Sequence, residues 1–122
     1  MRPARVLVVD DEPLVCEMLQ DCLTGEGWEV ICATNAKEAL GVQDVEVALV
    51  DAVLPSEVGG LELADRLEAR GIPVLMMSGH AEALERVATS GRPIVGKPFR
   101  LSALLSELES RAARPAGSPV ET

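Results

Sequence analysis

Aromatic residues and long apolar runs are scarce in this chain of 122 residues, which holds one Trp, one Phe and no Tyr. The core must therefore consist of Val, Leu, Ile and Ala, a composition that suits buried parallel strands covered by helices. No apolar run approaches the length needed to span a membrane. No N-terminal segment combines a basic start, an apolar stretch and a small-residue cleavage site, so we expect a cytoplasmic protein that does not associate with membranes.

Basic residues are also few, because 11 Lys and Arg stand against 20 Asp and Glu, for a formal charge of −9. This charge argues against direct binding to nucleic acid, whose phosphates favour Lys and Arg. Any effect on DNA is expected to be indirect. The length allows one domain with its own core and is too short for two of ordinary size.

The cysteines are odd in number and lack CxxC spacing, since they stand at Cys16, Cys22 and Cys32. This pattern is poor material for a disulfide framework or a zinc site. We expect all three to be small buried hydrophobic residues.

Short apolar runs alternate with segments of helical periodicity along the chain. The predicted strands are 5–10, 28–33, 45–51, 72–78 and 93–95, and the helices begin near 13, 35, 61, 81 and 101 and end near 25, 40, 71, 90 and 111. The fourth helix is expected to be short and weakly amphipathic. Right-handed crossovers then predict an α/β fold with a doubly wound, five-stranded parallel sheet in the order 2-1-3-4-5 and five helices. Residues 1–111 form the predicted domain, and 112–122, rich in Pro, Gly, Ser and Ala, a disordered tail or linker.

Polar residues follow four of these strands directly, where each apolar run ends. They are Asp10 with Asp11, then Asp51, Ser78 and Lys97. Because ligands of open α/β sheets bind outside the carboxyl ends of the strands, we expect these side chains to meet at one edge. Three close carboxylates repel one another unless a cation lies among them, and Mg²⁺ prefers such hard oxygen ligands.

Such a site suits phosphoryl transfer, which needs positioning and charges that meet the developing negative oxygens. An Asp carboxylate can attack phosphorus and form an aspartyl phosphate. Lys97 can supply a positive charge, and the Ser78 hydroxyl and the Gly79 N–H can donate hydrogen bonds. Pro98 can hold Lys97 in a fixed direction, and a cis Lys97–Pro98 bond is one way to do so.

Four motifs now carry a resemblance to a known family. VLVVDDEP, VALVDAVLP, VLMMSGHA and VGKPF, in this order, resemble the receiver domain of two-component response regulators, from about Arg5 to Arg111. Each motif alone is weak evidence, but the ordered set is specific. The resemblance implies a flavodoxin-like fold, as in single-domain chemotaxis-type regulators or the receivers of hybrid histidine kinases.

The resemblance also implies roles for individual residues. Asp51 would accept a phosphoryl group from a histidine kinase or a histidine phosphotransfer protein. Asp11 and Asp51 would bind Mg²⁺ directly, Asp10 mostly through water, and the Val53 carbonyl would complete the metal site. Ser78 would be the switch hydroxyl, paired with Lys97, and Gly79 would contact the phosphoryl group. The output would be contact with an unknown downstream protein, without separate enzyme activity.

Three features depart from the family pattern. Ile94 stands where Tyr or Phe is common, which argues against a rotating aromatic switch. The stretch between Ser78 and Lys97 is short, which predicts a reduced fourth helix and output face. The loop 56–60 is one residue longer than usual.

Other interpretations remain open from the residues alone. The chain could be a pseudo-receiver that only binds partners. It could be a haloacid-dehalogenase-type phosphatase, although position 53 is Val where that mechanism needs a second acid, and the chain has no room for a cap. Asp10 and Asp11 could simply favour the positive end of the first helix. His80, the sole histidine, either tunes water access to the phosphoryl group or is an exposed loop residue without a role.

Overall fold

The computed structural model describes residues 3–54 and 58–112. Residues 113–122 of the predicted tail and residues 56 and 57 of the loop 56–60 lie outside the described residues. The elements in chain order are β1 (Arg5–Val9), α1 (Pro13–Thr24), β2 (Glu29–Ala33), α2 (Ala36–Leu40), β3 (Val47–Asp51), α3 (Gly60–Ala69), β4 (Val74–Ser78), α4 (Ala81–Thr89), β5 (Ile94–Gly96) and α5 (Leu101–Arg111).

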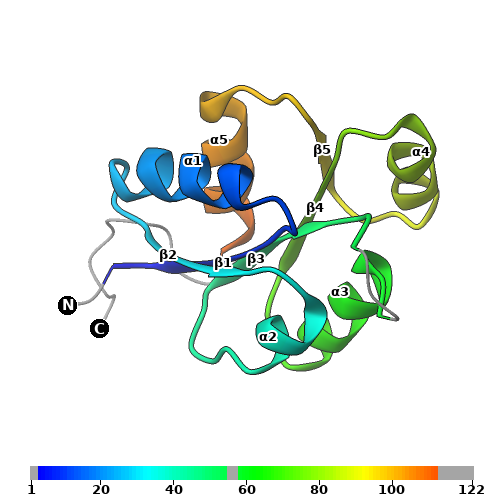
Figure 1. Ribbon diagram of the computed structural model, residues 1–122, viewed down its shortest axis with the longest axis horizontal. Coiled ribbons are helices and arrows are strands. Elements are labelled where there is room, and N and C mark those ends of the chain that lie inside the picture. The colour runs from blue at the N-terminus through cyan, green and yellow to red at the C-terminus, as the bar shows by residue number, and fades with distance from the viewer. Residues whose placement is uncertain (1–2, 55–57, 113–122) are drawn as a thin grey trace.

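The five strands form one parallel sheet in the order β2-β1-β3-β4-β5, which confirms the predicted fold class and topology. Helices α1 and α5 cover one face, and α2, α3 and α4 cover the other (Figure 1). Strand ends differ from the prediction by two residues at most.

Successive residues of β1 show why both faces are buried. Leu7 and Val9 belong to the core beneath α2, α3 and α4, whereas Val6 and Val8 belong to the core beneath α1 and α5. Side chains of a strand point alternately to its two sides, so a strand covered by helices on both faces must be apolar throughout. Trp28 is buried in the core beneath α1 and α5.

The ladder aligns the carboxyl ends of the strands. Asp51 pairs with Met77 across β3 and β4, and Ser78 pairs with Gly96 across β4 and β5. The residues that follow β1 and β5, Asp10 and Lys97, therefore come to the same edge as Asp51 and Ser78. This register positions the site.

Helix α2 begins at a defined cap, because Asn35 Oδ1 accepts a hydrogen bond of 2.9 Å from the Glu38 amide. The Glu38 carboxylate in turn accepts from the Thr34 amide at 2.7 Å. Asn35 is therefore the N-cap of α2.

Two expectations about packing were wrong. Helix α4 is clearly amphipathic, since Ala83 and Val87 are buried on one face while Glu82, Glu85 and Arg86 are exposed. Its two buried residues are small, which hid the pattern. Two of the three cysteines are less buried than expected: Cys32 is exposed, because β2 is an edge strand, and Cys22 is half-buried.

Across the described part of the chain, no helix combines the length and apolar character that crossing a membrane requires.

Candidate functional site

Three carboxylates meet at the carboxyl edge of the sheet. Asp10, Asp11 and Asp51 each offer an oxygen, and these oxygens lie within 4.8 Å of one another. Asp10 is 0% exposed and Asp51 6%, whereas Asp11 is exposed. The three acids meet at one edge, as the strand ends predicted, and two of them are buried beside a third that faces solvent.

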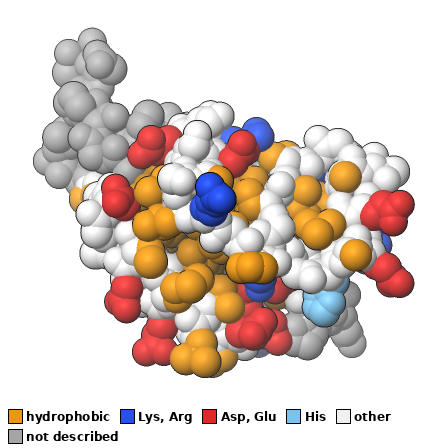
Figure 2. All heavy atoms as spheres, turned by 90° about the horizontal axis from the view of Figure 1, so that it is seen from above, with side chains coloured by type: hydrophobic (Ala, Val, Ile, Leu, Met, Phe, Trp, Pro, Cys, Tyr) orange, Lys and Arg blue, Asp and Glu red, His pale blue; other side chains and the backbone are white. Residues whose placement is uncertain are grey.

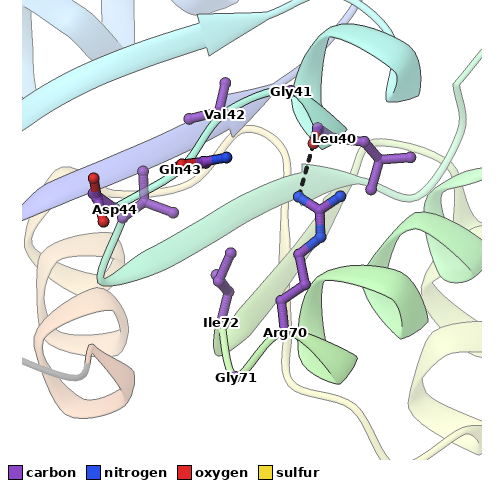
Figure 3. Close-up of a pocket in the computed structure, with 9 residues that line it drawn as sticks. Leu40, Gly41, Val42, Gln43, Asp44, Arg70, Gly71 and Ile72 are labelled. Atoms are coloured by element: carbon purple, nitrogen blue, oxygen red, sulfur yellow. Dashed lines mark hydrogen bonds between the residues drawn. The ribbon is translucent and has the colours of Figure 1, made fainter.

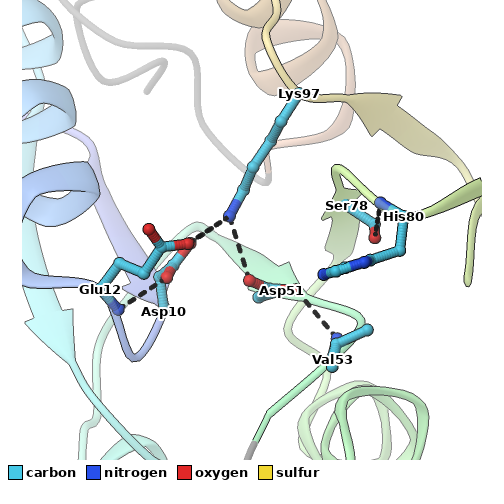
Figure 4. A network of polar contacts seen from close by, with 7 residues as sticks. All are labelled: Asp10, Glu12, Asp51, Val53, Ser78, His80 and Lys97. Atoms are coloured by element: carbon cyan, nitrogen blue, oxygen red, sulfur yellow. Dashed lines mark hydrogen bonds and ion pairs between the residues drawn. The ribbon is translucent and has the colours of Figure 1, made fainter.

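The Lys97 ammonium joins the two buried acids (Figure 4). Its nitrogen donates to Asp10 Oδ2 at 2.6 Å and to Asp51 Oδ2 at 3.0 Å. The other oxygen of each acid accepts a backbone N–H, from Glu12 for Asp10 and from Val53 for Asp51, both at 2.9 Å. The buried carboxylates are therefore held in fixed directions from both sides.

Lys97 is positioned by β5, because its amide donates to the Ser78 carbonyl at 2.8 Å and extends the ladder to β4. The Lys97–Pro98 bond that follows is cis. Burial would lower the pKa of Lys97, but the hydrogen bonds and charges of Asp10 and Asp51 outweigh it and raise the pKa. The ammonium is therefore charged at neutral pH.

At Asp51, in contrast to Lys97, the effect of burial on the pKa outweighs the effect of the hydrogen bonds. Burial raises its pKa, the Val53 amide and Lys97 oppose the rise, and the charge of Asp10 adds to it, with a raised pKa as the net result. The ionised carboxylate is thus more costly here than in water. Additional positive charge beside Asp51 would remove that cost.

Ser78 and its neighbours form the wall next to Asp51. Ser78 is fully buried, and its Oγ accepts a hydrogen bond of 3.0 Å from the His80 amide. Figure 4 shows the His80 imidazole directed toward Asp51 and Val53. A Cβ on Gly79 would lie 3.6 Å from the Lys97 Cβ, an ordinary contact, so the protein itself does not require glycine there.

Gly60 also shapes the site, and the sequence interpretation missed it. This first residue of α3 is buried against the backbone at the end of β3, and a Cβ there would lie 2.7 Å from the Ala52 Cα. No side chain fits without moving the chain that carries Asp51. A glycine pair before a helix was the only signal in the sequence, and it cannot reveal a contact across the fold.

The comparison with known families now bears on this edge. The family model of the response regulator receiver domain matches residues 6–109. The chain belongs to this family. It is 30% identical over 129 residues to the probable transcriptional regulatory protein TcrX of Mycobacterium tuberculosis, an alignment that covers 99% of this chain and 55% of TcrX. The chain thus spans about half the length of the curated relatives it matches.

Solved receivers share the architecture. The receiver domain of NtrX from Brucella abortus superposes with a TM-score of 0.78 and 30% identity over 87% of this chain and 96% of that one. TrrA from Thermotoga maritima, solved with Mg(2+)-BeF, gives 0.77 and 26% over 88% of this chain and 97% of that one. The flavodoxin-like receiver fold predicted from the motifs is confirmed.

The acidic cluster of this receiver fits a divalent metal ion. It offers hard oxygen donors within 4.8 Å of one another, and one ammonium balances only part of their charge. A metal ion near Asp51 would offset the burial and the Asp10 charge that raise its pKa. Asp10, Asp11 and Asp51 are the side chains that could hold it.

A pocket lies at the amino ends of the strands, at the edge of the sheet opposite the acidic site (Figure 3). It has a volume of about 480 Å³ and is lined by the loops before β3 and β4. Arg70 from one loop donates to the Leu40 carbonyl at 2.7 Å, so its guanidinium ties the two loops together. Ligands of this sheet type bind at the other edge, and the pocket lies apart from Asp51.

Ile94 occupies the position where the sequence analysis noted that Tyr or Phe is common in receiver domains. It is partly buried and packs against the core beneath α2, α3 and α4. A branched aliphatic side chain there fills space without a ring to rotate.

Proposed function

We propose that this receiver accepts a phosphoryl group on Asp51, from the phosphohistidine of a histidine kinase or of a phosphotransfer protein, with Mg²⁺ in the acidic cluster. One observation carries the proposal: the buried Asp51 carboxylate lies 3.0 Å from the Lys97 ammonium and within 4.8 Å of the oxygens of two further acids. The Asp51 nucleophile thus lies next to the oxygens that can bind a metal ion and to the ammonium that can bind phosphoryl oxygens.

The residues act in one displacement. A carboxylate oxygen of Asp51 attacks phosphorus, the P–N bond to the donor imidazole breaks, and the imidazole keeps the electron pair. Lys97 then has phosphoryl oxygens to bind in place of the carboxylates. The Ser78 hydroxyl and the Gly79 N–H donate to the remaining oxygens. Mg²⁺, when bound, reduces the repulsion between the carboxylates and the anionic donor.

His80 is proposed to control the lifetime of the aspartyl phosphate. Its imidazole is directed toward Asp51 in Figure 4, and in this position it would limit the access of water to the phosphoryl group. Hydrolysis by water releases inorganic phosphate and restores the carboxylate, so the domain acts only on its own phosphoryl group. His80→Ala should therefore hydrolyse faster, and an unchanged rate of phosphate release would exclude this role.

The donor is proposed to dock over α1 and the segment after β5. A groove of about 330 Å³ there is lined by Val15, Met18, Lys97, Pro98 and Phe99. Figure 2 shows apolar side chains gathered on the α1 and α5 face, with acidic side chains around them. Because Lys97 belongs both to this groove and to the acidic site, a protein seated in the groove is next to Asp51.

Output is proposed to pass through protein contacts. Among the relatives, TcrX is named as a probable transcriptional regulatory protein, and this chain spans about half of it. The formal charge of −9 disfavours direct contact with nucleic acid. A downstream protein that distinguishes the phosphorylated form is the simplest recipient of the signal.

The test is phosphorylation with acetyl phosphate and Mg²⁺, followed by intact mass spectrometry. We expect a base-labile mass increase of one phosphoryl group in the wild type and in Asp21→Asn, an exposed acid of α1 that serves as the control. Asp51→Asn should show none. An unlabelled wild type would favour a pseudo-receiver, and turnover of a phosphate ester over many equivalents would favour a phosphatase.

A further inference from the structure

Two cysteines from different elements contact each other outside the acidic site. The Cys32 thiol of β2 donates to the backbone carbonyl of Cys16 in α1, with 3.8 Å between sulfur and oxygen. The Cys32 side chain is also near enough to the Cys16 thiol to contribute to the raised pKa of Cys16. They are 16 residues apart in the chain, so the fold brings them together.

The two thiols differ in access. Cys16 is 7% exposed and lies in the core beneath α1 and α5, whereas Cys32 is exposed on the edge strand. Cys22, the third cysteine, is half-buried further along α1, and all three are free thiols. Cys32 is thus the more accessible residue of the pair, and Cys16 is the buried residue beside it.

We propose that Cys16 and Cys32 form an oxidation site, at which a hydroperoxide converts the two thiols into a disulfide that joins α1 to β2. This modification is separate from the phosphorylation of Asp51 and does not depend on it.

The reaction has two steps. The Cys32 sulfur attacks a peroxide oxygen, the O–O bond breaks, and the leaving hydroxide takes the thiol proton, which gives a sulfenic acid and water. The Cys16 sulfur then attacks the Cys32 sulfur, the S–O bond breaks, and the second hydroxide takes the Cys16 proton. Two thiols and one hydrogen peroxide thus give one disulfide and two waters.

The order of the steps follows from the environment of each thiol. Burial raises the pKa of Cys16 to about 12, and the hydrogen bond to Cys32 and the charges of Cys32 and Asp10 add to this effect. Cys16 therefore stays protonated at neutral pH and is a poor first nucleophile. The exposed Cys32 reacts first, and Cys16 resolves its sulfenic acid by proximity.

The disulfide would connect two parts of the molecule with different roles. Helix α1 follows Asp10 and Asp11 and carries the groove residues Val15 and Met18, while β2 is an edge strand. A cross-link between them removes freedom from the unfolded chain and fixes α1 to the sheet. Thermal unfolding of the oxidised protein should therefore occur at a higher temperature, and dithiothreitol should reverse the change.

The test is titration of the reduced 122-residue chain with hydrogen peroxide, alkylation of the remaining thiols and digestion without reduction. Cleavage after Glu17, Glu26 and Glu29 places the three cysteines on separate peptides. We expect the peptides of Cys16 and Cys32 to be cross-linked within one chain, with Cys22 alkylated.

Matched variants complete the test. Cys22→Ser should keep the cross-link, whereas Cys16→Ser and Cys32→Ser should each lose it, and Cys16→Ser should accumulate oxidised Cys32. A disulfide that involves Cys22, a Cys32 disulfide between two chains, or Cys32 sulfinic acid without a cross-link in the wild type would each overturn the proposal.

Discussion

The ammonium nitrogen of Lys97 lies 3.0 Å from Asp51 Oδ2, although 46 residues separate the two in the chain. Both side chains leave the sheet at its carboxyl edge, Asp51 at the end of β3 and Lys97 just after β5. The same ammonium reaches Asp10, so it holds together the acids that would otherwise repel each other. The two acids and the ammonium therefore stabilise one another without a metal ion or a phosphoryl group.

Removal of the ammonium should destabilise the protein. Lys97→Met leaves the buried Asp10 and Asp51 carboxylates without their cation, and we expect the free energy of unfolding to fall by about 1–3 kcal/mol. Urea unfolding in chelator measures the loss, and Mg²⁺ should recover part of it. Lys37→Met, at an exposed position of α2, is the control, and equal losses in both variants would contradict this account.

Neutralising Asp51 should have the opposite effect in chelator. Burial is the main cause that raises the pKa of Asp51 above the ordinary 3.8. A carboxyl group with a raised pKa in the folded state stabilises the fold while it is protonated. This contribution is fully present below pH 3.8 and is lost as the pH rises through the pKa of the folded state. Asp51→Asn is therefore expected to increase the free energy of unfolding at pH 7, with a gain that shrinks as the pH falls toward 3.8.

Denaturant unfolding of Asp51→Asn across this pH range measures the effect, with Asp21→Asn as the exposed control. Lower stability of Asp51→Asn at pH 7 would mean that the bonds from Lys97 and Val53 outweigh burial.

The Gly60 contact predicts a difference between neighbouring glycines. Gly60→Ala places a Cβ 2.7 Å from the Ala52 Cα, so we expect a loss of about 1–3 kcal/mol and weaker Mg²⁺ binding at Asp51. Gly59→Ala meets nothing within 4 Å and should cost no more than about 1 kcal/mol, since Ala is a poorer N-cap than Gly. Thermal unfolding and Mg²⁺ titration measure both variants. Similar unfolding temperatures and Mg²⁺ affinities for the two variants would show that the backbone around residue 60 shifts at little cost to accept the extra Cβ.

The groove on α1 predicts a separation between large and small phosphoryl donors. Met18 is 49% exposed in that groove, and Met18→Glu should slow transfer from a phosphorylated histidine protein by roughly tenfold, through about 1.4 kcal/mol of lost docking. Labelling by acetyl phosphate, which needs no docking, should stay as in the wild type. Equal rates of protein-to-protein transfer in variant and wild type would place the docking surface elsewhere.

The apolar pattern was sufficient to predict the sheet and its acidic edge. Each central strand is a continuous run of Val, Leu, Ala or Met that ends in a polar residue, and parallel pairing then gathers those polar residues. The positions of Asp10, Asp51 and Ser78 follow from these two facts, and Lys97 reaches the same edge because it follows the parallel edge strand β5. Their chemical roles depend on a bound metal ion and phosphoryl group and stay predictions.

The failures of the sequence prediction concern contacts between distant segments. The exposure of Cys32 depends on β2 being an edge strand, and its contact with Cys16 depends on how α1 lies on the sheet. The requirement for Gly60 depends on the backbone after Asp51. In α4, Ala83 and Val87 are too small to give a strong apolar period, although the fold buries both.

Chemical mapping of the phosphoryl group tests the central claim most directly. Borohydride reduces an aspartyl phosphate to homoserine, so protein treated with acetyl phosphate and Mg²⁺ can be reduced, digested and sequenced by mass spectrometry. We expect homoserine at position 51 alone, dependent on Mg²⁺ and absent from Asp51→Asn. Homoserine at position 10 or 11, or none at any acid, would contradict the assignment of Asp51 as the phosphoryl acceptor.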